Sequence, residues 1–343
     1  MNNYINPSRQ GRPPPGKIRI VEDQIAFASA SLKQTGTAWQ VGSSDGYTLS
    51  RFHAAGWRVR AIEPSAAANR LAETLYGVET FTGLLEDYIP HASERCDLLI
   101  MTHVLEHLYS PDHAMLHAAR LLKDDGHLLI EVPSVTSPDE WCAGFFSFEH
   151  VSYFSPATIT RLLLQNGFDL VTAPQLAHDF HGNPALRCLA RKRSPGQPST
   201  ALPPNDYLRA QDVCRSYWGR EQAVWRRNDA LIKSSIEGDL KVVIWGAGIH
   251  TSQLLTRCPS LAAVKIEFIA DNDPQKQGHR LGLSAIRPVS EIDFTDPDLV
   301  VIISTHAGEA EILKTLSERP DLRARIVPLY HSLEKLPSGA TTK

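Results

Sequence analysis

The sequence predicts an α/β protein with two open, largely parallel sheets, and two features lead to this prediction. Compact apolar runs of strand length alternate with amphipathic segments of helix length along most of the chain. The alternation stops at a polar, proline-rich stretch, residues 194–206, and starts again at Leu240. Strands that alternate with helices favour parallel sheets with helices on both faces. A chain of 343 residues is long enough for two such domains.

The first half begins with a polar, proline-rich tail over residues 1–16, and a helix is expected at about 20–34. Predicted strands cover residues 37–41, 59–63, 97–102, 127–132, 168–172 and 185–191. Helices are expected at 64–76, with Pro64 first and Gly77 just past the end, and at 113–122, before a turn at 124–126. Ser155 has the pattern of an N-cap for a last helix, which Gly167 ends.

The second half begins with a long helix over residues 207–236. Strands are then predicted at 241–245, 266–273, 298–305 and 325–329, and helices at 250–257 and 308–318. We therefore expect a tail at 1–16, a first domain at 17–193, a linker and helix at 194–238, a smaller second domain at 239–334 and a tail at 335–343. Both domains have the strand–turn–helix order of a Rossmann-like fold.

Composition excludes several functions. The net charge of −3 gives no overall attraction to nucleic acid or to an anionic membrane. Nine basic residues nevertheless lie between Arg187 and Arg227, and we interpret them either as a solvated helix face or as a surface that attracts a phosphorylated substrate. No apolar run approaches membrane-spanning length. The five cysteines are far apart and odd in number, which fits reduced thiols. We therefore expect a cytoplasmic protein without membrane insertion.

A glycine-containing turn, WQVGSSDG, links the first strand to the next helix at residues 39–46. Glycine removes the side-chain obstruction, so such a turn lets main-chain N–H groups approach a cofactor. Glu63 ends the following strand, 21 residues after Gly42. A carboxylate at that place can accept hydrogen bonds from both hydroxyls of a ribose. The alternative is a structural turn with a solvated glutamate.

Three segments, VGSSDG, RAIEPS and CDLLIMTHVLEHLYSPDHAMLHAARLLKDDGHLLIEVPS, make residues 35–192 resemble the class I S-adenosylmethionine-dependent methyltransferases. The resemblance implies a seven-stranded sheet and S-adenosyl-L-methionine as cofactor. The loop would enclose the methionine part of the cofactor, and Glu63 would bind the ribose hydroxyls. The segment after residue 83 would lie near the adenine. The residues that it places at the cofactor are Gln40, Gly42, Ser43, Ser44, Asp45, Gly46, Glu63, Pro64, Leu84, Leu85, Glu86, Thr102 and His103.

Two positions depart from the pattern of that family. Gln40 stands where an acid is usual, and Ser44 replaces the middle glycine of the loop. Glutamine can donate and accept hydrogen bonds, but it cannot form an ion pair with the methionine ammonium group. These departures favour a weaker cofactor site, and they leave open a non-catalytic protein that kept the fold.

A second segment, FFSFEHVSYFS at residues 145–155, resembles a stretch of the sugar C-methyltransferases of deoxysugar biosynthesis, which also end in a Rossmann-like domain. The resemblance implies His150 as the base, Glu149 as its support and a nucleotide-linked sugar or glycan precursor as acceptor. His107 and Tyr153 are further candidates. The cysteine-rich zinc module of that group has no counterpart here, and Ser147 stands where tyrosine is common. Methylation of oxygen or nitrogen in another small metabolite therefore stays open.

Two histidine pairs, His103 with His107 and His113 with His117, have a spacing of four residues that metal sites on helices often use. No third ligand follows either pair in the sequence, so the prediction is that no metal is bound.

The second glycine turn, IWGAGIHT at residues 244–251, also follows a strand and opens a helix. The N-terminus of this helix could hold a phosphate. Ser252 falls near the third glycine of the G-x-G-x-x-G pattern, which favours a purely structural turn, and an NAD site is a further alternative. We expect acceptor contacts at this sheet edge from Gly246, Gly248, His250, Asp271, Thr305 and His306. The expected partner is a small molecule, and a homodimer is one candidate for the oligomeric state.

Overall fold

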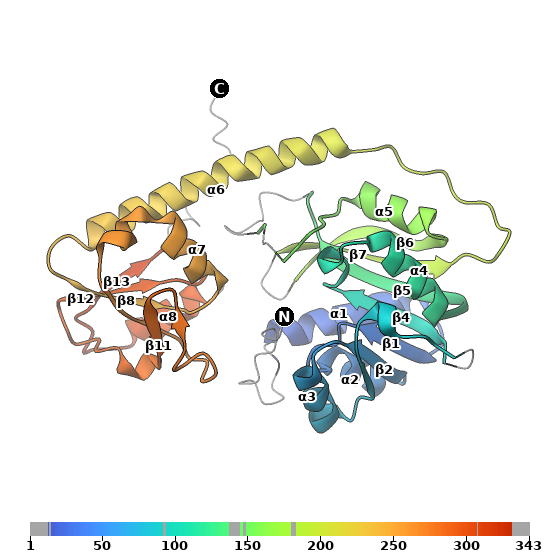
Figure 1. Cartoon of the computed structure of the whole chain (residues 1–343), viewed down its shortest axis with the longest axis horizontal. Coiled ribbons are helices and arrows are strands. Elements are labelled where there is room, and N and C mark those ends of the chain that lie inside the picture. The colour runs from blue at the N-terminus through green and yellow to red at the C-terminus, as the bar shows by residue number, and fades with distance from the viewer. Residues whose placement is uncertain are drawn as a thin grey trace. The chain divides into compact units, whose positions relative to one another are not determined.

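The computed structural model describes residues 13, 15–91, 94–136, 145–146, 149–179, 183–306 and 308–330. Ser147, the tail at 335–343 and all but three residues of the tail at 1–16 lie outside this set. The chain divides into two compact units, with the boundary between Tyr217 and Trp218 (Figure 1), and each unit is described by itself. No helix within the described ranges has the length and apolarity needed to cross a bilayer.

The first unit is built on a sheet of seven strands. These are β1 Thr37–Val41, β2 Arg58–Glu63, β3 Thr80–Thr82, β4 Cys96–Thr102, β5 Leu122–Pro133, β6 Phe168–His178 and β7 Pro184–Lys192. Their spatial order is β3-β2-β1-β4-β5-β7-β6. β7 runs antiparallel to both of its neighbours, and the other pairings are parallel. The predicted seven-stranded, largely parallel sheet is confirmed.

Alternation along the central strand β4 places the two cores of this unit. Leu99 and Met101 pack into one apolar cluster, whereas Leu98 and Ile100 pack into another. Successive side chains of a strand point to opposite faces, so a continuous apolar run is buried on both sides. Both faces of the sheet are therefore covered by helices.

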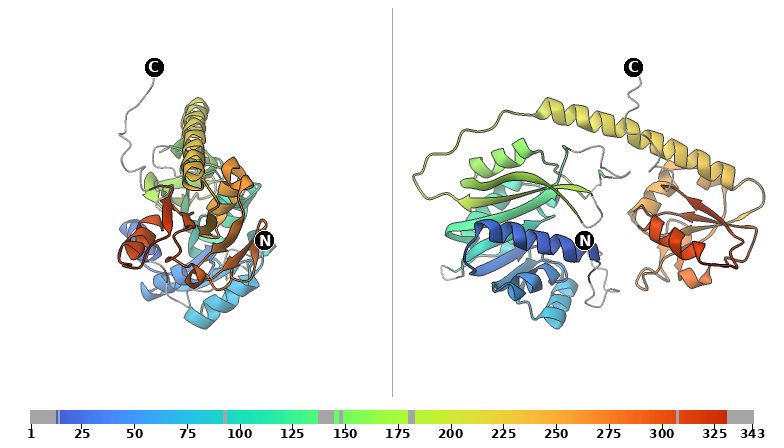
Figure 2. Two further views of the ribbon diagram at one scale, coloured as in Figure 1. Left: turned by 90° about the vertical axis from the view of Figure 1, so that its left-hand side faces the viewer. Right: turned by 180° about the vertical axis from the view of Figure 1, so that it is seen from behind.

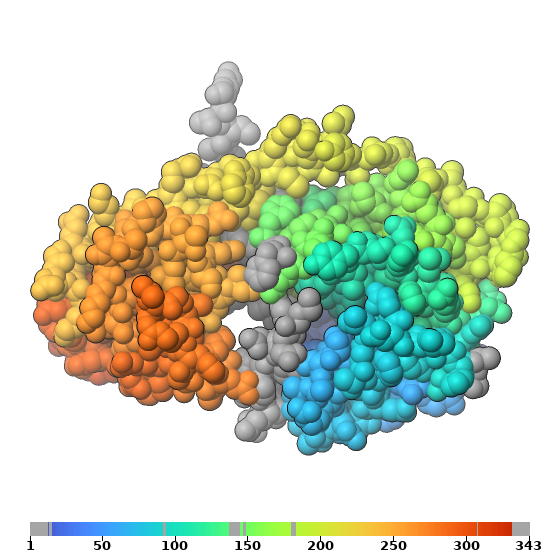
Figure 3. Space-filling model, viewed as in Figure 1, coloured from blue at the N-terminus to red at the C-terminus, as the bar shows by residue number. Residues whose placement is uncertain are grey.

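The helices of the first unit are α1 Pro15–Ser31, α2 Tyr47–Ala54, α3 Ala66–Tyr76, α4 Pro111–Leu121 and α5 Pro156–Gln165. α4 and α5 bury residues in the cluster that contains Leu99, and α1, α2 and α3 bury residues in the cluster that contains Leu98. The view from behind shows α1 across its face of the sheet (Figure 2). Side chains of the helices and loops form the visible face of this unit in the space-filling view (Figure 3).

The second unit contains a six-stranded sheet in the order β10-β11-β9-β8-β12-β13. Its strands are β8 Lys241–Trp245, β9 Ile266–Ala270, β10 Arg280–Leu281, β11 Ser284–Arg287, β12 Leu299–Ile303 and β13 Arg325–Pro328. Its helices are α7 Ile249–Arg257, α8 Glu309–Ser317 and the part of α6 Tyr207–Ser235 that follows the unit boundary. Ile244 packs with Trp225 of α6 on one face, and Val243 packs with Leu316 of α8 on the other.

Several boundaries differ from those predicted. α1 begins at Pro15, inside the predicted tail, and α3 begins after Pro64, because the Ser65 side chain accepts a hydrogen bond from Ala68 N and caps the helix. Residues 124–126 belong to β5 rather than to a separate turn, with Asp125 in the left-handed region at φ 61°. The short strands β3, β10 and β11 were not predicted.

Candidate active site

The first glycine turn joins β1 to α2, and three of its residues have left-handed backbone conformations. Gly42, Ser44 and Gly46 have φ values of 69°, 52° and 76°. A Cβ atom on Gly42 would lie 2.6 Å from Cγ2 of Val104, so only glycine fits there. Ser44 adopts the left-handed conformation although it is not glycine, which costs about 1–2 kcal/mol. The departure at Ser44 therefore leaves the shape of the loop intact.

Glu63 ends β2 beside this turn, as predicted, and main-chain donors fix its carboxylate. Its side chain is buried, and Oε2 accepts a hydrogen bond of 3.0 Å from Ser44 N while Oε1 accepts one of 2.9 Å from Ser65 N. Each carboxylate oxygen has a second lone pair, so both can still accept from ligand hydroxyls. The structure thus joins the loop and the strand-end acid into one preorganised edge.

Gln40 lies beneath the loop, near the end of β1. Its side chain is buried, and Nε2 donates to Thr102 Oγ1 at 3.4 Å, whereas Oε1 is buried without a hydrogen-bond partner. The free oxygen can accept a hydrogen bond from an ammonium group. Ser43 Oγ is likewise buried without a partner. Asp45 is already paired with Lys17 Nζ at 2.7 Å, so its carboxylate serves to hold α1.

The predicted adenine segment follows β3. The side chain of Leu85 is buried in the core of the sheet, whereas Leu84 is 53% exposed and Glu86 is exposed. Asp87 accepts a hydrogen bond of 3.1 Å from Leu84 N, which holds the turn. Of the three predicted residues, Leu84 presents an apolar side chain at the surface that an adenine ring could cover.

His103 follows β4 and forms part of a buried ionic cluster. Its Nδ1 lies 3.3 Å from Oε1 of Glu106, and its Nε2 lies 3.3 Å from Oε1 of Glu131. Glu131 in turn accepts a hydrogen bond of 2.6 Å from Nε of Arg187. Burial disfavours the charged imidazole, but the two carboxylates outweigh it and raise the pKa of His103 to about 10. The two carboxylates therefore favour the charged form of the His103 ring near neutral pH.

The sequence prediction missed three members of this cluster, Glu106, Glu131 and Arg187. Glu131 and Arg187 are partners across the antiparallel β5–β7 pair, and all three side chains are buried. The interpretation of the basic segment as a helix face is wrong for Arg187, Arg191 and Lys192, which lie in β7, and Arg187 is also buried. For Glu131 and Arg187 the signal was available, because each stands between apolar residues inside a predicted strand.

The predicted acceptor residues gather around the turn that follows His103. The rings of His107 and His150 have centroids 4.8 Å apart, and Tyr153 lies 5.6 Å from His150. Burial lowers the pKa of His150, which Glu106 only partly opposes, so its imidazole is neutral near pH 7. Glu149 contacts His107 through its main-chain carbonyl, which lies 2.9 Å from Nδ1, and burial raises the pKa of its carboxyl.

The acceptor cluster is adjacent to the predicted donor loop. Val104, whose side chain fills the space over Gly42, is followed directly by the single turn Leu105–His107. The main-chain N–H groups of Val151 and Ser152 donate to the carbonyl of Glu106 at 2.9 and 3.1 Å, which holds the two segments together. A neutral imidazole at this place can accept a proton from an acceptor held beside the loop.

In the second unit, the predicted acceptor residues meet at the carboxyl ends of β8, β9 and β12. Gly246 has φ 118°, and a Cβ there would lie 2.8 Å from the Ser304 carbonyl oxygen. His250 lies between Ser304 and Tyr330, with which its ring nitrogens form hydrogen bonds. Burial, with a smaller effect of His306, lowers the pKa of His250 to about 4.

The other predicted residues at this edge already have partners in the fold. Asp271 accepts hydrogen bonds from Ala247 N at 2.7 Å and from Asp273 N at 2.8 Å, so it secures the turn. Thr305 Oγ1 accepts from Gly308 N at 3.3 Å, and His306 is exposed. Gly248 is the N-cap of α7.

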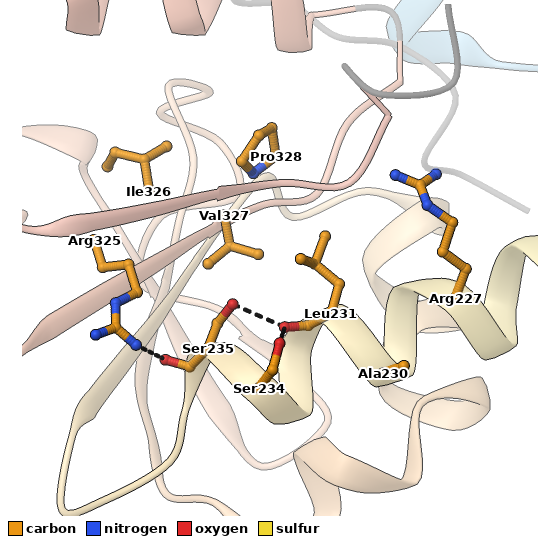
Figure 4. Close-up of a pocket in the computed structure, with 9 residues that line it drawn as sticks. All are labelled: Arg227, Ala230, Leu231, Ser234, Ser235, Arg325, Ile326, Val327 and Pro328. Atoms are coloured by element: carbon orange, nitrogen blue, oxygen red, sulfur yellow. Dashed lines mark hydrogen bonds between the residues drawn. The ribbon is translucent and has the colours of Figure 1, made fainter. Parts of the chain in front are cut away.

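A separate groove of about 690 Å³ lies between α6 and β13 of the second unit (Figure 4). Arg325 donates to the Ser235 carbonyl at its edge, and Arg227 and Val327 also line it. None of the predicted acceptor residues lines this groove.

Comparison with known proteins identifies the first unit. Residues 16–173 match the model of a family described as a methyltransferase domain. No curated protein matches the chain. The 1,6-didemethyltoxoflavin-N1-methyltransferase of Burkholderia thailandensis is similar at 18% identity over 51% of this chain and 78% of that chain, with a TM-score of 0.41. The magnesium protoporphyrin IX methyltransferase of Synechocystis PCC 6803 is similar at 18% identity over 52% of this chain and 84% of that chain, with a TM-score of 0.42.

The matched residues include most of the seven-stranded unit, from α1 into β6. Over residues 16–173 this unit matches a methyltransferase domain, in agreement with the predicted S-adenosylmethionine-dependent methyltransferase. The predicted enzyme class and cofactor are thus confirmed, whereas the match does not specify the acceptor.

Proposed function

We propose that the enzyme methylates a sugar, either a nucleotide-linked sugar or a glycan precursor. The observation that carries this proposal is the group formed by His107, Glu149 and His150 beside the donor loop. The segment that contributes Glu149 and His150 is the one that resembles the sugar C-methyltransferases. Neutral imidazole is suited to removing a proton from a weakly acidic acceptor near pH 7.

On this proposal the donor lies across the carboxyl edge of β1 and β2. Glu63 accepts hydrogen bonds from both ribose hydroxyls, Gln40 accepts from the ammonium group through its free oxygen, and Leu84 covers the adenine. S-adenosylmethionine supplies a methyl carbon that already carries a good leaving group, so alignment of the acceptor is the main task of the protein. The loop from Gly42 to Gly46 provides that alignment through main-chain groups.

His150 acts as the base on this proposal, and Tyr153 limits the movement of its ring. The lowered pKa keeps the imidazole ready to accept a proton. Glu149 supports the site through its carbonyl contact with His107. For the second unit, acceptor contacts from Gly246, Gly248, Thr305 and His306 stay a prediction from the sequence.

A methyl-transfer screen tests the proposed function. Purified protein is incubated with S-adenosylmethionine and a panel of nucleotide sugars, and products are analysed for the added methyl group and its position. We expect transfer to one sugar class, slowed by at least about a hundredfold in His150→Ala, since a general base contributes about that much. His113→Ala, an exposed histidine on α4, is the control.

Three outcomes would contradict the proposal. Methyl transfer only to acceptors without a sugar would refute the proposed substrate class but not the assignment as a methyltransferase. Normal turnover in His150→Ala would remove this residue as the base. A protein that binds neither S-adenosylmethionine nor S-adenosylhomocysteine would favour the non-catalytic alternative, which the departures at Gln40 and Ser44 raise.

A further inference from the structure

Three metal-ligating side chains meet beside the donor loop. Glu106, His107 and His150 each place one ligand atom within 4.8 Å of the other two. The sequence spacing did not reveal this set, because the predicted pair was His103 with His107 and the remaining ligand, His150, lies 43 residues after His107. The fold supplies the third ligand that the sequence pattern lacks.

His107 is held in the state that a metal ligand requires. Its Nδ1 lies 2.9 Å from the Glu149 carbonyl oxygen, which can only accept a hydrogen bond, so Nδ1 carries the proton. Nε2 is thus the nitrogen left to bind a metal, and it lies 3.9 Å from Oε1 of Glu106. Ligating histidines commonly have their second nitrogen fixed by such a carbonyl.

Glu106 is a fully buried carboxylate, and neither of its oxygens accepts a hydrogen bond from any residue that the structure describes. His103 lies 3.3 Å from Oε1, but the geometry does not form a hydrogen bond, and Oε2 also lacks one. The charged His103 ring offsets part of the charge of Glu106, but a buried carboxylate that accepts no hydrogen bond still pays for its lost hydration, and a coordinated cation would offset that cost. His150 Nδ1 is also buried without a partner, so two of the three side chains have unused ligand atoms.

We propose that Glu106, His107 and His150 bind one divalent transition-metal cation of the Zn²⁺ or Co²⁺ type, with open positions for oxygen atoms of the acceptor. Two imidazoles and one carboxylate suit such cations better than Mg²⁺, which prefers oxygen ligands. Ligand atoms around tetrahedral zinc lie about 3.3 Å apart. Side-chain movements of about 1 Å would close the present arrangement around an ion.

This inference rests on the proposed function only in assigning the open positions to the acceptor. A hydroxyl bound to such a cation is more acidic than a free one, so the acceptor can ionise without a histidine base. A nitrogen of His150 that binds the metal cannot also accept a proton. The metal site and the base are thus alternative roles for the same lone pair.

Cobalt titration tests the site without using activity. The full chain is treated with EDTA, freed of chelator and titrated with Co²⁺, and the visible absorption bands of the bound ion are followed. We expect saturation at one cobalt per chain and loss of the bands when Zn²⁺ is added. Glu106→Gln and His150→Ala should each weaken cobalt binding by at least about tenfold. Loss of a residue that only supports a metal ligand weakens binding by about 10–100-fold, so loss of a ligand itself should cost at least the lower value.

The matched control is His113→Ala, because His113 is an exposed histidine on α4 outside the cluster. It should bind cobalt like the unchanged protein. Absence of saturable cobalt binding, or binding unaffected by both Glu106→Gln and His150→Ala, would overturn the inference. Calorimetry with S-adenosylhomocysteine on the same samples tests the function separately and also reports whether each variant is folded. Donor binding without cobalt binding refutes the metal site alone, and cobalt binding without donor binding refutes the function alone.

Discussion

The buried pair of Glu131 and Arg187 should be essential to the first unit. Glu131 is fully buried, Arg187 is 7% exposed, and the two face each other across β5 and β7 with Nε 2.6 Å from Oε2. The substitution Glu131→Gln keeps the size of the side chain and removes its charge. Arg187 then remains as a buried cation without its carboxylate, and His103 loses one of the two carboxylates that keep its pKa high.

Breaking a buried ion pair by removing one partner costs about 3–5 kcal/mol. Because 1.4 kcal/mol is a factor of ten, amides that exchange by unfolding of the unit should exchange about a hundredfold to a few thousandfold faster. Hydrogen exchange of the β5 and β7 amides, followed by mass spectrometry, measures this effect in the first unit alone. This local measurement avoids assuming that both units unfold together.

Lys123→Met is the matched control on the same strand. Lys123 pairs with Asp97 at 2.8 Å, but their side chains are 44% and 39% exposed. Removing an exposed pair costs under about 1 kcal/mol. If Glu131→Gln accelerates exchange no more than Lys123→Met does, the reasoning from buried charge is refuted.

Three further predictions concern the loop, the base and the second unit. Gly42→Ala should abolish S-adenosylhomocysteine binding in calorimetry, because the new Cβ would lie 2.6 Å from Cγ2 of Val104. The control Gly77→Ala should retain binding, because Gly77 also has a positive φ of 64° but a Cβ there would meet nothing within 4 Å. Equal binding by the two variants would contradict the close approach of Val104 to Gly42. The methyl-transfer rate should fall as pH falls, with its midpoint below the ordinary histidine pKa of 6.5, because burial lowers the pKa of His150; a midpoint above 6.5 in the pH profile would contradict this. His250 has a pKa of about 4 in the folded unit, against 6.5 in the unfolded chain. Between these pH values only the unfolded state binds the extra proton, so the free energy of unfolding of the second unit should fall by up to about 3 kcal/mol as pH falls from 6.5 to 4. Acid unfolding of His250→Gln followed by hydrogen exchange of β8 should lack most of this dependence, and an unchanged dependence would contradict the assignment.

The longer elements of the fold could be predicted because their apolar patterns are long or their caps are explicit. β4 and β12 are apolar runs, and Ser155 and Gly167 bound α5 as their residue types suggest. The two-residue strand β10 carries no periodic signal of its own, and its existence depends on pairing with β11. Local pattern cannot supply such tertiary pairing.

The proximity of the first glycine turn to Glu63 was predictable because these residues lie at fixed intervals along one strand–turn–helix–strand unit. Gly42 and Glu63 are such a pair. The acceptor half depends on distant segments, since His107 and His150 meet only after β5 has been added to the sheet. Glu106 lies next to a predicted residue, yet only burial without a hydrogen-bond partner distinguishes it from an ordinary helix-end glutamate.

A crystal structure with S-adenosylhomocysteine tests the central claim most directly. The account predicts both ribose hydroxyls within hydrogen-bond distance of the Glu63 carboxylate and the methionine part along the loop from Gly42 to Gly46. A ligand bound elsewhere, with Glu63 contacting only Ser44 and Ser65, would contradict it.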